Sequence, residues 1–405
     1  MKESILNRAQ GVQQRIEQAV LALMQKLPKE ITARNTLIFC VLALLCIGTV
    51  MVASASMPYA ERLHENSMHY VARHLMYLVV AFGAAITAYQ IKLKNWFGKM
   101  PVLMWLGTAI LLILVLLIGR DVNGSTRWLN IAGFTLQPSE IAKFAMAVFT
   151  ADYVVRRGGE VRESLVSLLR LSIPVGTTVA LIMLEPDLGA SAVIVCTVAL
   201  IFFLAGAPVK ALLSVIGVVV AFLTTFILIE PYRLRRMLSF SNPWEDPQGA
   251  GYQLSQSLMA FGRGEWLGTG LGHSVQKLAY LPEAHTDFML AVTAEELGFV
   301  GISLIFSLSF LMVACCMRIA HRALNNQHLR SGYLAYGIAI IFFLQICVNA
   351  GMNMGLIPTK GLTLPFISYG GSSLLICAFM MGVMFRIDRE TQAVNTPERI
   401  KQGMN

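Results

Sequence analysis

Apolar runs of about twenty residues recur along nearly the whole chain, separated by mostly short polar connections. Each run is long enough to cross a hydrocarbon core of about 30 Å as a helix. The runs are continuous rather than alternating, which excludes a transmembrane β-barrel. The pattern therefore predicts an all-α integral membrane protein. The predicted spans number about ten and cover residues 37–56, 70–90, 101–118, 139–155, 168–184, 188–206, 210–229, 295–317, 332–354 and 366–385.

The composition agrees with residence in a membrane. Of the 405 residues, 56% are hydrophobic and only 14% are charged, which is less charge than a soluble domain of this size carries. One boundary stays open, because the fifth and sixth runs are separated only by Glu185, Pro186 and Asp187. These two runs form either two short spans or one broken span.

Basic residues flank the spans and set their orientation. With ten spans, the basic connections lie on one side, and the positive-inside rule places both termini in the cytoplasm. This topology accounts for the net charge of +9, so no nucleic-acid partner is predicted. The seven cysteines all fall inside predicted spans, which indicates packing residues rather than a disulfide framework.

The chain divides into three predicted parts. Residues 1–36 form a cytoplasmic segment, in which apolar residues at helical spacing over 5–27 predict an amphipathic helix on the inner leaflet or on a partner. Residues 37–388 form the transmembrane domain, and residues 389–405 form a cytoplasmic tail. The transmembrane domain includes a periplasmic loop at 230–294, between the seventh and eighth spans, and loops of this length are usually functional.

The stretch 280–288, at the end of this loop, holds the strongest candidate chemistry. Glu283, His285 and Asp287 stand there beside an apolar span, and ionisable groups at a membrane boundary are costly unless they are paired, solvated or used. The spacing of the three is not that of a zinc site. Asp287 lies at the water–membrane boundary, directly before Phe288, where a carboxylate can serve as a general base.

Cations on the outer side are a second group of candidates. Three arginines break the charge rule in the long loop, where they contact either lipid headgroups or a phosphorylated ligand, which guanidinium groups grip in a bidentate manner. Cations from other connections can join the same basic surface. The candidates for binding an anionic ligand are Arg233, Arg235, Arg236, Arg127, Lys277, Lys360 and Arg263.

Two further pairs carry charge close to predicted spans. Glu140 and Lys143 are three residues apart at the start of the fourth span, so they share a helix face and either pair with each other or orient a polar cavity. Glu185 and Asp187 flank an outer turn. An unpaired acid is costly there, so a partner such as an outer-loop arginine is expected.

Six motifs form a distinctive set. They are residues 242–257 (NPWEDPQGAGYQLSQS), 260–264 (AFGRG), 276–287 (QKLAYLPEAHTD), 358–373 (PTKGLTLPFISYGGSS), 138–140 (PSE) and 185–189 (EPDLG). Together they resemble the SEDS family, named for shape, elongation, division and sporulation. The resemblance covers essentially all of the chain after the first span. The Trp-Glu-Asp-Pro turn and the Gln276-Lys277 pair favour the division-type branch over the elongation-type branch.

The resemblance implies an enzyme of the bacterial inner membrane, located at the division septum. It implies a peptidoglycan glycosyltransferase that polymerises lipid II, a disaccharide peptide on undecaprenyl diphosphate. The essential loop aspartate of the family falls on Asp287, and Glu283 and Lys360 match other functional positions. His285 and Ser368, which lie within the motifs, complete the predicted substrate-binding set. The implied partners are a class B penicillin-binding protein (the transpeptidase FtsI), the divisome membrane proteins FtsQ, FtsL, FtsB and FtsN, and membrane lipids.

The implied chemistry needs one base. Forming a β-linkage from an α-diphosphate donor inverts the anomeric carbon, so a single displacement suffices, without the carboxylate pair of a glycosidase. No metal-binding motif is visible, and Mg²⁺ or Mn²⁺ at the diphosphate is a hypothesis motivated by the substrate alone. Three alternatives remain: a flippase for lipid-linked precursors, a scaffold that recruits the transpeptidase, and an elongation-type polymerase.

Overall fold

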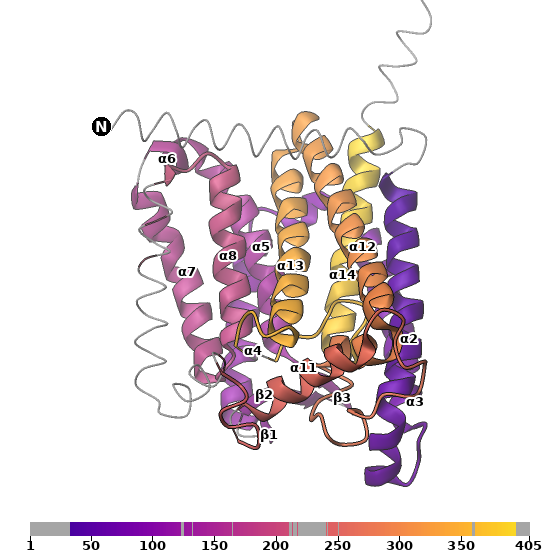
Figure 1. Cartoon of the computed structure of the whole chain (residues 1–405). Helices are drawn as coiled ribbons and strands as arrows, with labels where there is room; N and C mark the ends of the chain where they lie inside the picture. The colour runs from indigo at the N-terminus through magenta and orange to yellow at the C-terminus, as the bar shows by residue number, and fades with distance from the viewer. Residues whose placement is uncertain are drawn as a thin grey trace, which may run out of the picture.

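The computed structural model describes residues 33–393 apart from 123–124, 132, 164, most of 210–241, 250 and 359–360. The described residues form a bundle of upright helices with short elements across one end (Figure 1). Two shorter pieces, η1 (Leu93–Trp96) and α6 (Gly158–Glu163), connect upright helices. The upright helices are α2 (Ala33–His64), α3 (His69–Gln90), α4 (Met100–Ile118), α5 (Pro138–Arg156), α7 (Leu165–Leu184), α8 (Leu188–Leu204), α12 (Met289–Asn325), α13 (Leu329–Asn353) and α14 (Gly371–Ala393).

Nine of the ten predicted spans coincide with these upright helices, and the doubtful fifth and sixth runs are separate helices, α7 and α8. By length and composition, 7 of the described helices can cross a membrane, whereas α8 is shorter and α5 contains four charged residues. The predicted span 210–229 lies almost wholly outside the described residues. So do the amphipathic segment 5–27 and the end of the chain after residue 393. The ten-span topology and the three-part division therefore stay predictions.

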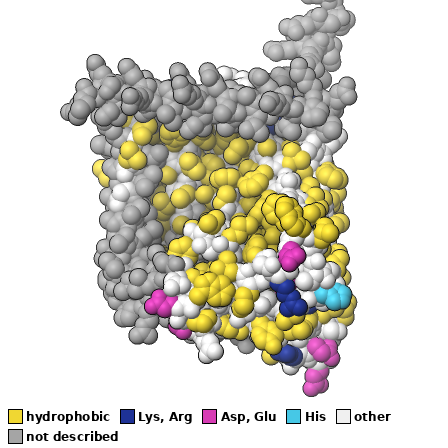
Figure 2. All heavy atoms as spheres, in the orientation of Figure 1, with side chains coloured by type: hydrophobic (Ala, Val, Ile, Leu, Met, Phe, Trp, Pro, Cys, Tyr) yellow, Lys and Arg dark blue, Asp and Glu magenta, His cyan; other side chains and the backbone are white. Residues whose placement is uncertain are grey.

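The surface of the bundle fits a lipid environment. Hydrophobic side chains cover most of the described part of the face in Figure 2, and charged side chains gather towards the end that carries the short elements. Val79 and Leu117 are each 74% exposed, and Phe82 is 70% exposed. Large apolar side chains that are this exposed are stable when lipid hydrocarbon, rather than water, surrounds them. The chain is a multi-pass membrane protein.

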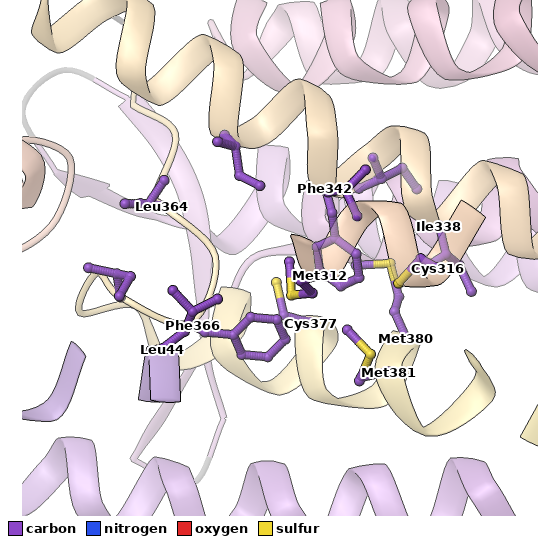
Figure 3. Close-up of a cluster of buried hydrophobic side chains, with 14 of the residues drawn as sticks. Leu44, Met312, Cys316, Ile338, Phe342, Leu364, Phe366, Cys377, Met380 and Met381 are labelled. Carbon is purple, nitrogen blue, oxygen red and sulfur yellow. The ribbon is translucent and has the colours of Figure 1, made fainter. Parts of the chain in front are cut away.

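The main core joins α2, α12, α13 and α14. Phe342 of α13 and Phe366, just before α14, have ring centroids 5.7 Å apart. Met312, Cys316 and Cys377 are buried in the same cluster (Figure 3). All seven cysteines are unpaired; four are buried as packing residues, whereas Cys46 and Cys196 are exposed on the bundle surface.

The end of the bundle with the short elements, called the outer end below, is not purely helical. Strands β1 (Arg120–Val122), β2 (Ser125–Ile131) and β3 (Phe134–Leu136) form an antiparallel sheet in the order β1-β2-β3. Helix α11 (Tyr252–Gly264) crosses the same end (Figure 1). The sequence pattern predicted no strands here, because β1 and β3 have only three residues each and carry too little alternation to be recognised.

Helix α12 differs most from its prediction. It begins at Met289, six residues before the predicted span, and it is broken at Gly298, where φ is 64° and ψ is −163°. The break leaves backbone amides without partners inside the helix, and carbonyl groups of the preceding loop accept hydrogen bonds from them. The amides of Phe299 and Val300 donate to the carbonyls of Glu265 and Trp266 at 2.9 and 3.1 Å. The broken helix and the loop are therefore one hydrogen-bonded unit.

We expect Gly298→Ala to destabilise this unit. An added Cβ would lie 2.3 Å from the amide nitrogen of Gly268 and 2.6 Å from the carbonyl oxygen of Trp266, and the positive φ penalises any side chain. The expected loss is at least about 2 kcal/mol of unfolding free energy. Thermal unfolding in detergent measures it. The control is Gly107→Ala, where a Cβ meets nothing within 4 Å. Equal melting temperatures for the two variants would contradict the expectation.

Candidate active site

Asp287 lies at the outer end, two residues before α12, and it is partly buried. Two buried amides of α13 hold its backbone, because Asn349 and Asn353 each donate through Nδ2 to its carbonyl oxygen at 3.0 Å. Asn349 also donates to the carbonyl oxygen of Leu362 at 2.6 Å. Sequence reasoning missed both asparagines. The available signal was a pair of amides four residues apart in an apolar span, which puts them on one helix face.

Arg127 approaches the same place from β2. A Cβ atom on Gly361 would lie 3.1 Å from Oδ2 of Asp287 and 3.2 Å from Nη1 of Arg127. Oδ2 of Asp287 and Nη1 of Arg127 are therefore at most about 6 Å apart, and the missing side chain of Gly361 leaves room for both. Of the cations that the sequence proposed near Asp287, Arg127 is the one that the described residues bring to it.

The turn between α7 and α8 fixes the other side of Arg127. Its Nε donates to the carbonyl oxygen of Glu185 at 3.1 Å, and its Nη2 donates to that of Pro186 at 2.6 Å. The expected outer-loop arginine is thus present, but it binds the backbone of the turn. Asp187 begins α8 by accepting from the amide of Ala190 at 3.0 Å, and it also accepts from Ser139 at 3.2 Å.

The Glu185 carboxyl is buried against this arrangement, and neither of its oxygens has a hydrogen-bond partner among the described residues. Burial and then the neighbouring charge of Asp187 raise the pKa of Glu185 to about 8, although Arg127 opposes the rise. The carboxyl is therefore neutral at pH 7. The neutral Glu185 carboxyl therefore adds no negative charge beside Arg127.

Glu140 and Lys143 form the predicted pair, with Nζ 2.8 Å from Oε2. Both are almost fully buried in α5, so each charge needs the other. This confirms the interpretation of their spacing as an ion pair.

His285 is enclosed by tyrosines. Its ring centroid lies 5.1 Å from that of Tyr59 and 5.0 Å from that of Tyr70, while its carbonyl accepts from the amide of Tyr369 at 3.0 Å. Burial lowers the pKa of His285, so the imidazole is neutral. Glu283 is partly exposed and accepts from Thr286 at 2.8 Å. These contacts order the loop that carries Asp287.

Lys277 and Ser368 lie in buried hydrogen-bonded positions. Nζ of Lys277 lies 2.6 Å from Oε1 of Glu296 and donates to Ser54 at 2.8 Å. Oγ of Ser368 accepts from the amide of Leu364 at 3.0 Å, within a turn. Arg233, Arg235, Arg236 and Lys360 lie outside the described residues.

The described residues contain no cluster of three or more His, Cys, Asp or Glu side chains that fits a metal ion.

These features define a multi-pass membrane protein with a carboxylate and a guanidinium close together at one end of its helix bundle. The model of the FtsW, RodA and SpoVE family, described as a cell cycle protein, matches residues 34–393. The chain belongs to this family, which is the SEDS family that its motifs resemble.

Relatives and solved structures agree with this assignment. The chain is 61% identical over 391 residues to a probable peptidoglycan glycosyltransferase FtsW of Acinetobacter baylyi, with 96% of this chain and 98% of that protein covered. It is 45% identical to the protein of the same name in Escherichia coli, over 88% of this chain and 86% of that one.

Two structures share the fold at 26% identity and cover 88% of this chain. One comes from a study of the structural coordination of polymerization and crosslinking by a peptidoglycan synthase complex, with a TM-score of 0.73 and 97% of that chain covered. The other is the rod shape determining protein RodA of Thermus thermophilus, with a TM-score of 0.63 and 96% of that chain covered.

We expect Glu185→Gln to flatten the pH dependence of stability. In the unfolded chain this carboxyl titrates near 4.5, and in the folded protein near 8. Between these values unfolding releases a proton, so the unfolding free energy falls as pH rises, by up to about 1.4 kcal/mol per pH unit. The variant lacks this loss and is the more stable protein at pH 8.5. Melting temperatures from pH 5 to 9 test this, and parallel curves for the two proteins would contradict it.

Lys277→Met is expected to cost about 3–5 kcal/mol, because it leaves the Glu296 carboxylate buried without its cation. Adding Glu296→Gln removes that charge and restores most of the stability. The double variant also separates two roles for Lys277. If the lysine serves the ion pair, the double variant polymerises; if the lysine binds substrate as the sequence predicted, the variant folds but is inactive. The contacts favour the first outcome.

Proposed function

We propose that this protein is a peptidoglycan glycosyltransferase that polymerises lipid II during septal wall synthesis, with Asp287 as its general base. The observation that carries the proposal is the partly buried carboxylate within about 6 Å of Arg127 at the outer end of a membrane bundle. A high-identity relative named peptidoglycan glycosyltransferase FtsW supports the reaction and the division-type branch.

The reaction is an inverting displacement. The 4-hydroxyl of one sugar attacks the anomeric carbon of a lipid-linked donor, a carbon–oxygen bond forms, and the bond to the diphosphate breaks. Asp287 accepts the hydroxyl proton. The electron pair leaves with the diphosphate, whose growing charge a fixed guanidinium stabilises. Arg127 suits that task because two backbone carbonyls already hold its Nε and Nη2, which leaves Nη1 directed towards Gly361.

The place of the site at the bundle end fits the substrate. An undecaprenyl chain stays in hydrocarbon, while its diphosphate and sugars lie at the membrane boundary. A base at that boundary can reach the sugars without removing the lipid from the bilayer. Lys360, Arg233 and Arg236 remain predicted contributors. A divalent cation also remains a prediction, and no step above requires one.

The proposed partner is a class B penicillin-binding protein. The structure with the 0.73 TM-score belongs to a peptidoglycan synthase complex that coordinates polymerization and crosslinking, which supports a transpeptidase partner for this chain. FtsI, FtsQ, FtsL, FtsB and FtsN, the septal location and the inner membrane as the particular membrane belong to the same proposal.

Asp287→Asn tests the assignment in purified protein reconstituted with lipid II and, if required, the transpeptidase. We expect polymer formation to fall by about 10²–10⁴-fold, the usual contribution of a general base, with lipid II binding within about threefold of normal. The matched control is Glu245→Gln, which removes an exposed carboxylate from the same long loop and should leave the rate unchanged.

The outcomes separate the alternatives. Full activity of Asp287→Asn would exclude Asp287 as the base. Lipid II transport without polymer from any preparation would favour a flippase, and neither activity, with the partner present, would favour a scaffold.

A further inference from the structure

A column of three amides runs along one face of α13, at Gln345, Asn349 and Asn353. The four-residue spacing places them on one side of the helix, and all three are fully buried. Buried amides without partners are costly, so each should bind something or be explained. The two nearest the outer end bind the Asp287 loop, whereas neither amide atom of Gln345 has a partner among the described residues.

We propose that Asn349 and Asn353 are positioning residues that set the distance between the base and Arg127. The inference rests on the proposed function of Asp287, and it concerns how the carboxylate is held. Two donors converge on one carbonyl oxygen, that of Asp287 itself, at 3.0 Å each. A carbonyl held from two points on a rigid helix cannot shift along the helix or rotate without breaking a buried bond.

Asn349 also joins the two sides of the site. The same Nδ2 that binds Asp287 donates to the carbonyl oxygen of Leu362 at 2.6 Å. Leu362 follows Gly361, the residue beside which Oδ2 of Asp287 and Nη1 of Arg127 both lie. The Asn349 amide thus holds both the segment that carries Asp287 and the segment that carries Gly361, next to Arg127.

The column is tied to the outer layer as well. Oγ of Ser257 in α11 donates to the carbonyl oxygen of Asn353 at 2.7 Å. In addition, Nδ2 of Asn353 donates to the carbonyl oxygen of Asn349 at 2.9 Å. Three separate segments are therefore hydrogen bonded to the end of α13: the loop with Asp287, the segment with Leu362, and α11. Rigid support of this kind matters because misplacing a catalytic group by about 1 Å can cost on the order of 10²-fold in rate.

The test compares shape-conserving variants along the column: Asn349→Leu, Asn353→Leu and, as the matched control, Gln345→Met. All three remove a buried amide from the same helix face. We expect Asn349→Leu to lower kcat for lipid II polymerisation by about 10–100-fold and Asn353→Leu by about 3–10-fold, because Asn349 binds both segments. The KM for lipid II should stay within about threefold. Gln345→Met should keep both values, since neither atom of its amide has a hydrogen-bond partner among the described residues.

A second readout does not depend on activity. Hydrogen exchange of the backbone amides in 286–292 and 361–366 should speed up in Asn349→Leu and stay normal in Gln345→Met. Faster exchange with an unchanged kcat, or normal exchange in both asparagine variants, would overturn the proposal. So would an equal loss of kcat in Gln345→Met. Should Asn349→Leu not fold, the Asn353→Leu result decides by the same two measurements.

The two proposals fail separately. If Asp287→Asn is fully active, the base assignment fails, while faster exchange in Asn349→Leu would still show that the amides hold the loop. If Asp287→Asn is inactive but the asparagine variants match the wild type in kcat and exchange, the positioning role alone is wrong.

Discussion

The interior of a bilayer offers no hydrogen bonds, so every charge and amide near its boundary must find a partner inside the protein. Several described polar groups at the outer end of this bundle obey that constraint, and the Glu185 carboxyl, which has no hydrogen-bond partner among the described residues, meets it by staying neutral. Lys277 pairs with Glu296, Arg127 binds the carbonyls of the α7–α8 turn, and Asn349 binds two loops at once. Removing any of these partners exposes a buried polar group to an environment that cannot satisfy it. The contacts that offset the cost of burying polar groups at the outer end therefore also make that end rigid.

Rigidity is what the proposed chemistry asks of the site. Asp287 and Arg127 come from segments far apart in the chain, and both reach the space beside Gly361 that a side chain there would fill. Neither group is placed by its own local structure. Asp287 is held through its backbone by α13, and Arg127 through its guanidinium by the turn before α8. Preorganised charges of this kind stabilise a developing anion without having to move during the reaction.

Much of the fold could be predicted from hydropathy, because crossing a membrane demands long apolar runs. Nine predicted spans coincide with helices, and the Glu140–Lys143 pair followed from helix spacing. The start of α12 was predicted wrongly: the predicted span opened at Glu295, whereas the helix begins at Met289 and holds Glu295 and Glu296 in its buried interior. Ser274 and Lys277 satisfy these two acids in three dimensions. The roles of Asn349 and Asn353 were equally hidden, because an amide in an apolar run does not reveal which distant carbonyl it binds.

The most direct measurement is a structure of the Asp287→Asn variant with lipid II bound as donor and acceptor. The account predicts the acceptor 4-hydroxyl within hydrogen-bond distance of residue 287 and the donor diphosphate in contact with Arg127. Sugars bound away from residue 287, with Arg127 still turned only towards the α7–α8 turn, would contradict it.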